Sequence, residues 1–305
     1  LPISSTAIER LPEQVRVAWQ SLNSCRGSAT SLVTSDCEGW ETTSPNFSNA
    51  IKPFSDTHKS NFYAWLARLK TYSSTPLRTA MVRVGSYYSS TGADSPYDDD
   101  LNGTANTQAV CRKNYHLLMT DGIWNDSDPT SPSLTNMDST NRTLPDSTAY
   151  SSQRPYLDTN SKSLADYAFY YWARDLVSLE NKVAPSLVDQ SGTAAQRYFN
   201  AKNDPATWQH MVNYTVGLGL TPFLTSSGLS WGSNTYDGSY PDILSGSKNW
   251  PTTGSSGPAG NAADLWHAAI NSRGKFYNVQ GPSELNAAFK DIVNTISTAA
   301  AAGGG

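Results

Sequence analysis

The sequence has few charged residues, and it lacks both a basic run and a long hydrophobic run. Only 16% of its 305 residues are charged, and 22 Lys and Arg stand against 26 Asp and Glu, giving a formal net charge of -4. Without a basic patch, nothing supplies the phosphate-neutralising surface that nucleic-acid binding requires. No run reaches the ~18 apolar residues of a transmembrane helix, so we expect neither a nucleic-acid partner nor membrane insertion.

Cysteine is also scarce, which excludes a small domain held together by many disulfides. The three cysteines are Cys25, Cys37 and Cys111, an odd number that allows at most one internal disulfide. Cys25 and Cys37 lie close together in a stretch rich in Gly, Ser and Thr, so we predict that they pair and stabilise the fold by about 3 kcal/mol. The alternative is three free thiols in a reducing compartment. The abundance of neutral polar residues and of Tyr and Trp is typical of proteins outside the cytosol.

The spacing of apolar residues predicts strands that alternate with helices. The predicted strands lie at 15–22, 115–120, 211–220 and 275–279. The predicted helices lie at 59–71, directly after Pro76, at 162–180, around 265–270 and at 285–296. Such alternation predicts an α/β fold in which a parallel sheet carries helices on both faces.

Four polar segments interrupt this alternation, at about 24–57, 91–110, 125–160 and 221–259. They are rich in Ser, Thr, Gly, Asn, Asp and Pro and show no steady period, so we interpret them as long loop insertions. We therefore expect one domain over residues 1–298. The Ala-rich and Gly-rich tail at 299–305 is predicted to be a linker.

Two oxygen-bearing side chains fall where an open parallel sheet places its ligand site, beyond the carboxyl ends of its strands. Asp121 directly follows the apolar run 115–120, and Thr75 lies just before the helix that follows Pro76. A carboxylate and a hydroxyl suit a hard divalent cation such as Mg²⁺ or Ca²⁺, which prefers oxygen ligands. The sequence therefore indicates a cation site that includes Thr75 and Asp121.

The segments around these two residues resemble known motifs. Residues 75–77 and 120–122 resemble the second and third motifs of a von Willebrand factor A domain, whose metal-ion-dependent adhesion site uses that threonine and that aspartate. Longer blocks resemble the PilY family of type IV pilus tip and biogenesis proteins. These blocks are residues 15–20, 111–125, 164–176, 203–211 and 264–271, and with the final helix the resemblance covers nearly the whole chain.

The resemblance implies a von Willebrand A-like fold and a role in adhesion or pilus biogenesis, not catalysis. The implied cation, held by Thr75 and Asp121, would offer an open coordination position to a carboxylate of a partner. The implied partners are minor pilins or other pilus components and a host or surface ligand. The implied location is the pilus tip at the cell surface, reached by export through the periplasm.

One family motif is missing from its expected place. The family pattern opens with a strand ending in Asp-x-Ser-x-Ser, and no segment upstream of Val15 has this form. We infer that the chain begins after that first strand, so we expect it to bind metal weakly or not at all by itself. The segment 189–193 has similar letters, but Pro185 lies just upstream, and we interpret it as a turn.

Two other functions remain open. Residues 228–232 match the Gly-x-Ser-x-Gly elbow of serine hydrolases, and Asp242 and His267 follow Ser230 in the order of that fold. However, no helical pattern follows this elbow, so the alternative is an exposed loop. The third possibility is a purely structural pilus-assembly module with a vestigial metal site.

The remaining candidate ligands favour structural roles. His58, His116, His210 and His267 show no zinc-binding spacing, and we predict that His116 and His267 are satisfied core residues. The acidic cluster of Asp94, Asp98, Asp99 and Asp100 lacks the spacing of an EF-hand loop. We interpret it, together with Asp126 and Asp128, as solvated turns.

Overall fold

A parallel sheet forms the centre of the molecule. The computed structural model describes residues 15–22, 49–67, 75–91, 95–98, 108–121, 123–254 and 258–303. The sheet consists of β3 (Asn114–Thr120), β6 (Met211–Leu218) and β7 (Phe276–Val279), in the spatial order β3-β6-β7. All neighbouring strands are parallel, with Asn114 opposite Met211 and Thr215 opposite Phe276.

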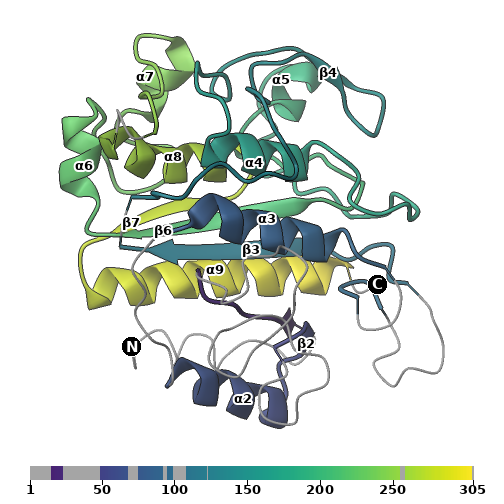
Figure 1. Ribbon diagram of the computed structural model, residues 1–305. Coiled ribbons are helices and arrows are strands. Elements are labelled where there is room, and N and C mark those ends of the chain that lie inside the picture. The colour runs from purple at the N-terminus through teal and green to yellow at the C-terminus, as the bar shows by residue number, and fades with distance from the viewer. Residues whose placement is uncertain are drawn as a thin grey trace.

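The sequence of β6 fits its central position. Seven of the eight residues in this strand are buried, because helices cover both faces of the sheet, as in parallel sheets generally. Figure 1 shows α4 (Leu164–Trp172) and α8 (Pro258–Asn271) on one side of the sheet and α9 (Pro282–Gly303) on the other. The predicted α/β class is therefore confirmed, and the arrangement is consistent with a von Willebrand A-like fold.

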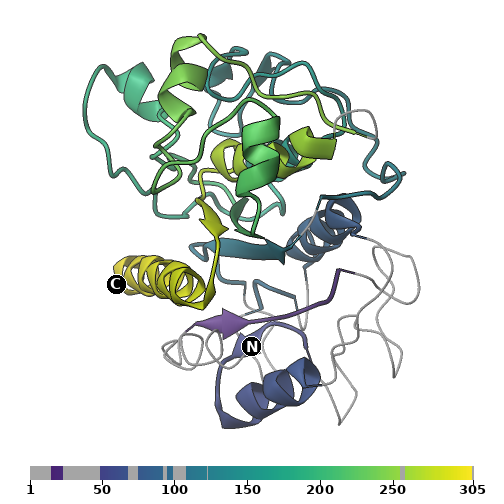
Figure 2. The ribbon, with the colours of Figure 1, turned by 90° about the vertical axis from the view of Figure 1, so that its left-hand side faces the viewer.

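The hydrophobic core is larger on one side of the sheet than on the other. The larger hydrophobic core lies on the side of α4 and α8, where α3 (Leu77–Tyr88) also packs against α4. The smaller core lies on the side of α9 and contains Val212, Tyr214 and Ile292. Figure 2 shows α9 beneath the strands and several elements stacked above them.

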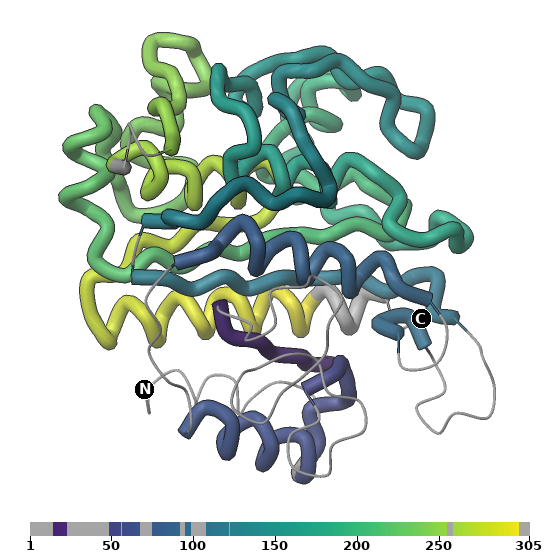
Figure 3. The backbone as a smooth tube through the Cα atoms, in the orientation of Figure 1, coloured from purple at the N-terminus to yellow at the C-terminus, as the bar shows by residue number. Residues whose placement is uncertain are grey.

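The described parts of the polar segments 125–160 and 221–259 form ordered structure over the larger core. The segment after β3 contains the short strands β4 (Arg142–Thr143) and β5 (Ala149–Tyr150), which pair in an antiparallel manner. Later segments contain α5 (Ala194–Tyr198), α6 (Thr221–Ser226) and α7 (Tyr240–Ser245). Figure 3 shows that these described parts run over the side of the sheet opposite α9.

A small N-terminal unit has its own aromatic core. The strands β1 (Arg16–Val17) and β2 (Lys52–Pro53) pair in an antiparallel manner and precede α2 (Asp56–Leu66). Trp19, Phe54 and Phe62 form a separate buried cluster. In Figures 1 and 2 this unit lies on the same side of the sheet as α9.

Several predicted boundaries are wrong, although the elements exist. The strand predicted at 15–22 is only Arg16–Val17, because Trp19 turns into the aromatic cluster. The helix predicted at 162–180 ends at Trp172, because the Leu176 amide donates to Gln209 O at 2.9 Å instead of continuing the helix.

The final helix is longer than predicted. It continues to Gly303, into the Ala-rich tail for which the sequence predicts a linker, while the domain boundaries themselves stay a prediction. Among the described residues, no helix combines the length and the apolarity that crossing a bilayer demands.

Candidate functional site

The two predicted cation ligands lie at the carboxyl edge of the sheet. Asp121 directly follows β3 and is exposed, and Thr75 lies just before α3. Figure 1 shows that α3 begins at the end of the sheet where β3 ends. The Thr75 amide donates to Asn125 Oδ1 at 2.7 Å, and the Asn125 amide donates to Thr75 O at 3.3 Å. These bonds join the loop after β3 to the segment before α3, while binding of a cation there stays a prediction.

Residues 123–128, here named the β3 exit loop, are held firmly through Trp124. The Trp124 Nε1 atom donates to Asp264 Oδ2 at 2.9 Å, and Trp124 O accepts from Asn261 Nδ2 at 3.0 Å. The guanidinium of Arg78 lies 4.0 Å from the centre of the Trp124 ring, a favourable cation–π contact. The exit loop is therefore anchored to both α3 and α8.

Asp126 anchors the exit loop to the first turn of α3. Its Oδ2 atom accepts from the Thr79 amide at 3.0 Å and from Thr79 Oγ1 at 2.9 Å, and its Oδ1 atom accepts from Arg78 Nε at 3.2 Å. The first amides of a helix have no partner within the helix, and a carboxylate there is also favoured by the helix dipole. The Asp126 side chain is only 6% exposed, so the prediction of a solvated turn is wrong at this residue.

The other acidic residues of the predicted turns differ among themselves. Asp128 is about half exposed, as predicted, and pairs with Arg78 at 2.8 Å and with Lys162 at 3.0 Å. Asp98 is buried and forms an antiparallel bridge with Gln108, so the prediction of a solvated turn is wrong there as well. Asp94, Asp99 and Asp100 lie outside the described residues.

Helix α8 carries a row of buried polar side chains, of which the sequence predicts only His267 to lie in the core. We name Asn261, Asp264, His267 and Asn271 the α8 polar face; each is at most 3% exposed. Asp264 accepts from the Leu164 amide at 2.7 Å and from the Ala165 amide at 3.0 Å, so it caps α4 from another helix. The only signal in the sequence is the near-helical spacing of these four residues, which is usual for a solvent-facing side.

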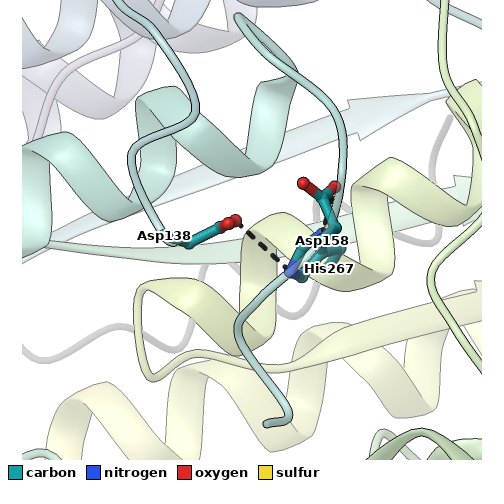
Figure 4. A group of neighbouring side chains, drawn as sticks. All are labelled: Asp138, Asp158 and His267. Carbon is teal, nitrogen blue, oxygen red and sulfur yellow. Dashed lines mark ion pairs between the residues drawn. The ribbon is translucent and has the colours of Figure 1, made fainter. Parts of the chain in front are cut away.

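His267 lies between two buried aspartates (Figure 4). Its Nδ1 atom is 3.4 Å from Asp158 Oδ2, and its Nε2 atom is 3.6 Å from Asp138 Oδ2. The Nε2 atom is also 2.5 Å from Tyr156 O, which can only accept a hydrogen bond. Since acceptors face both ring nitrogens, we assign a proton to each of them.

The charge on His267 fits this arrangement. Burial by itself lowers the pKa of His267, but the hydrogen bond to Asp158 and the charges of Asp138 and Asp158 raise it to about 9. Burial raises the pKa of Asp138 to about 7. One histidine and two carboxylates can ligate metals in other proteins, and a metal ion at this cluster would have to displace a ring proton. With both ring protons in place, His267 has no lone pair for base catalysis. The prediction that His267 is a satisfied core residue agrees with this geometry.

The residues of the hydrolase alternative do not form a catalytic triad. Ser230 Oγ lies 3.1 Å from Ser239 Oγ, and the Asp242 carboxylate lies 3.8 Å from Lys248 Nζ. His267 makes its contacts with the residues described above. Each member of the predicted Ser230, Asp242 and His267 set therefore has other partners.

The remaining sequence candidates behave as structural residues or lie outside the description. His116 is buried, with its Nδ1 atom 2.8 Å from Asn213 Oδ1, which agrees with a core role. The segment 189–193 forms the expected turn, in which Asp189 Oδ1 accepts from the Ser191 amide at 3.0 Å. Cys111 is exposed and free. Cys25 and Cys37 lie outside the described residues, so their pairing stays a prediction.

Comparisons with known proteins relate this chain to type IV pilus biogenesis factors. No family model matches the chain, and no solved structure does. The chain is 43% identical over 297 residues to the type IV pilus biogenesis factor PilY1 of Pseudomonas aeruginosa strain PAK, covering 96% of the chain and 24% of that protein. The PilY1 proteins of strains PAO1 and UCBPP-PA14 are 43% and 41% identical, again over 96% of the chain and 24% of each relative. The chain thus spans about a quarter of the length of the curated relatives it matches.

Proposed function

Because this chain belongs to the PilY family over 96% of its length, we propose that it is an α/β module of a type IV pilus biogenesis protein. The observation that carries this proposal is 43% identity across almost the whole chain. As such a module it would act outside the cell, at the pilus, and would contact minor pilins or other pilus components.

We further propose that the module recognises a protein or surface ligand through a divalent cation at the carboxyl edge of the sheet. Asp121 would supply negative charge, through a water molecule, and Thr75 would supply a neutral oxygen. An Asp-x-Ser-x-Ser motif from outside this chain would complete the ligand set. The cation, Mg²⁺ or Ca²⁺, would then leave one position for a carboxylate of the ligand.

The charges near this edge support the assignment of Asp121. The carboxylates of Asp126 and Asp128 are both engaged with Arg78, and Asp128 also pairs with Lys162. Within the described part of the chain, no group forms a hydrogen bond with the Asp121 carboxylate. Asp121 is therefore an exposed carboxylate, free to bind a cation, at the carboxyl end of the edge strand β3.

The test is a calorimetric titration of the full-length natural protein with Mg²⁺. We expect the wild type to bind and the Asp121→Ala variant to lose this binding. Asp242→Ala is the matched control, because Asp242 is also an exposed carboxylate but lies in α7, and it should bind as the wild type does. Binding that persists unchanged in Asp121→Ala would reject Asp121 as a ligand.

The same titration of the isolated 305-residue chain tests the need for the further motif. We expect weak or undetectable binding, because two ligands are too few for a hard cation. Tight binding by the isolated chain that requires Asp121 would show that the chain supplies the remaining ligands itself.

A further inference from the structure

Asp126 is a buried carboxylate whose oxygens are both used within the protein. Thr79 donates its amide and its hydroxyl to Oδ2, at 3.0 and 2.9 Å, and Arg78 donates Nε to Oδ1 at 3.2 Å. The Asp126 backbone carbonyl also accepts a hydrogen bond from Arg78. With these contacts and 6% exposure of its side chain, Asp126 has no oxygen directed at a cation in solvent.

Asp126 nevertheless lies between the two proposed ligands in the network of contacts. The adjacent Asn125 exchanges two backbone-directed hydrogen bonds with Thr75, at 2.7 and 3.3 Å. Asp121 precedes the same exit loop at the end of β3. A movement of Asp126 away from α3 would therefore displace Thr75 and Asp121 relative to one another.

We propose that Asp126 is a positioning residue for the cation site. It keeps Thr75 and Asp121 at a fixed position relative to one another by fixing the β3 exit loop to the first turn of α3. This inference rests on the proposed cation-dependent function. Asp126 acts through Thr79, Arg78 and the exit loop, and it does not contact the cation.

The negative charge of Asp126 also favours the binding of a cation at the proposed site. The Arg78 guanidinium is only 4% exposed, and Asp126 is the buried partner that balances it. Loss of the Asp126 charge would leave a buried cation near the proposed site, with the half-exposed Asp128 as its remaining acidic partner. That unbalanced positive charge would oppose the binding of a second cation.

The experiment compares Mg²⁺ affinity in the full-length protein with and without the Asp126 charge. Asp126→Asn keeps the size of the side chain, and we expect it to weaken Mg²⁺ binding by about tenfold or more, the usual effect of losing a group that orients metal ligands. Asp128→Asn is the matched control, because it pairs with the same arginine but is about half exposed. We expect it to change the affinity by less than about threefold, as for an exposed ion pair.

Two further measurements separate positioning from general stabilisation and from direct ligation. At saturating Mn²⁺, the electron paramagnetic resonance spectrum of Asp126→Asn should match that of the wild type, because the ligands are the same; a changed spectrum would make Asp126 a ligand and overturn the inference. Thr79→Val removes only the hydroxyl donor, and it should weaken Mg²⁺ binding in the same direction but less.

The outcomes distinguish this inference from the function on which it rests. If the wild type binds no Mg²⁺, the proposed function and the inference both fail. If the wild type binds, Asp121→Ala does not, and Asp126→Asn retains wild-type affinity, only the positioning role is overturned. If Asp126→Asn does not fold, Thr79→Val decides, and wild-type affinity in that variant overturns the inference.

Discussion

At the scale of single residues, the core depends on a protonated histidine. His267 donates to Tyr156 O and lies within 3.6 Å of Asp138 and Asp158. The side chains of all three residues are buried. A buried ion pair adds little net stability compared with apolar packing, but removal of one partner leaves an uncompensated charge, which is strongly destabilising. The protonation state of this cluster should therefore control the stability of the larger core.

The first prediction concerns pH. The pKa of His267 is about 9 in the folded protein and near 6.5 in the unfolded chain, so its stabilising effect is complete below pH 6.5 and is lost as the pH rises through 9. Asp138, whose pKa is raised by burial to about 7, acts in the same direction. We expect the free energy of unfolding, measured by urea denaturation, to fall between pH 6.5 and 9.

The control for this pH dependence is His267→Gln. This variant should be less stable at pH 6.5 by about 3–5 kcal/mol, as expected when one partner of a buried pair is removed. It should also show a flatter dependence on pH over the same interval. A wild-type stability that is constant or rises from pH 6.5 to 9 would contradict the assigned charge of His267.

At the scale of elements, the sequence predicts the parts of the fold that depend on local patterns. The run before Asp121 is apolar and ends abruptly, so β3 follows from the sequence, and β6, β7 and α3 follow in the same way. The buried position of Asp126 and the partners of the α8 polar face could not be predicted, because the residues that contact them are distant in sequence. Tyr156 O, for example, lies 111 positions from His267, and a polar row on a helix usually faces solvent.

The same limit applies to the candidate site. The ends of β3 and α3 come from local patterns, and the convergence of Thr75 and Asp121 at one edge follows from the rule for parallel sheets. The hydrogen bonds that join Asn125 to Thr75 and Asp126 to Thr79 could not be predicted in this way. They depend on the path of the exit loop, for which polar residues without a period give no signal.

The second prediction concerns the contact between α3 and α4. A Cβ atom added at Gly85 would lie 2.3 Å from the Tyr171 ring, so the two helices can approach only because residue 85 has no side chain. Replacing an exposed helical glycine by alanine stabilises a helix by about 1 kcal/mol. Here we expect the opposite sign, a loss of about 1–3 kcal/mol from overpacking, in urea unfolding of Gly85→Ala.

A matched control tests the cause of that loss. An added Cβ at Gly281 meets no heavy atom within 4 Å, so Gly281→Ala should have a much smaller effect. If Gly85→Ala instead raises the stability, the close packing of α3 on Tyr171 is not a constraint on the fold.

At the scale of the whole molecule, the sheet separates the larger hydrophobic core from the smaller one. The described parts of the insertions 125–160 and 221–259 lie over the larger core, on the side of the sheet opposite α9 (Figure 3), while the proposed cation site lies at the carboxyl edge of the sheet. The insertion 125–160 begins with the exit loop at that edge, where Asn125 bonds to Thr75 and Asp126 to Thr79, so the packing of this insertion and the geometry of the proposed site are linked.

The third prediction concerns partners of the full-length protein. If the cation site recognises a ligand, binding of purified minor pilins or of a surface ligand at this site should be lost in a chelator and in Asp121→Ala alike. The measurement is surface plasmon resonance with the full-length protein immobilised. Binding that is the same with and without the chelator would instead support the purely structural role with a vestigial site.

The α8 polar face has a consequence for engineering chimeras between relatives. Its side chains supply donors and acceptors to the backbone and side chains of residues 124–165, so helix and insertion form one matched set. A graft that takes the insertion from a relative while retaining this helix would mismatch buried donors and acceptors. Exchange of the two segments together preserves their complementarity, which makes the pair, and not the loop alone, the transferable unit.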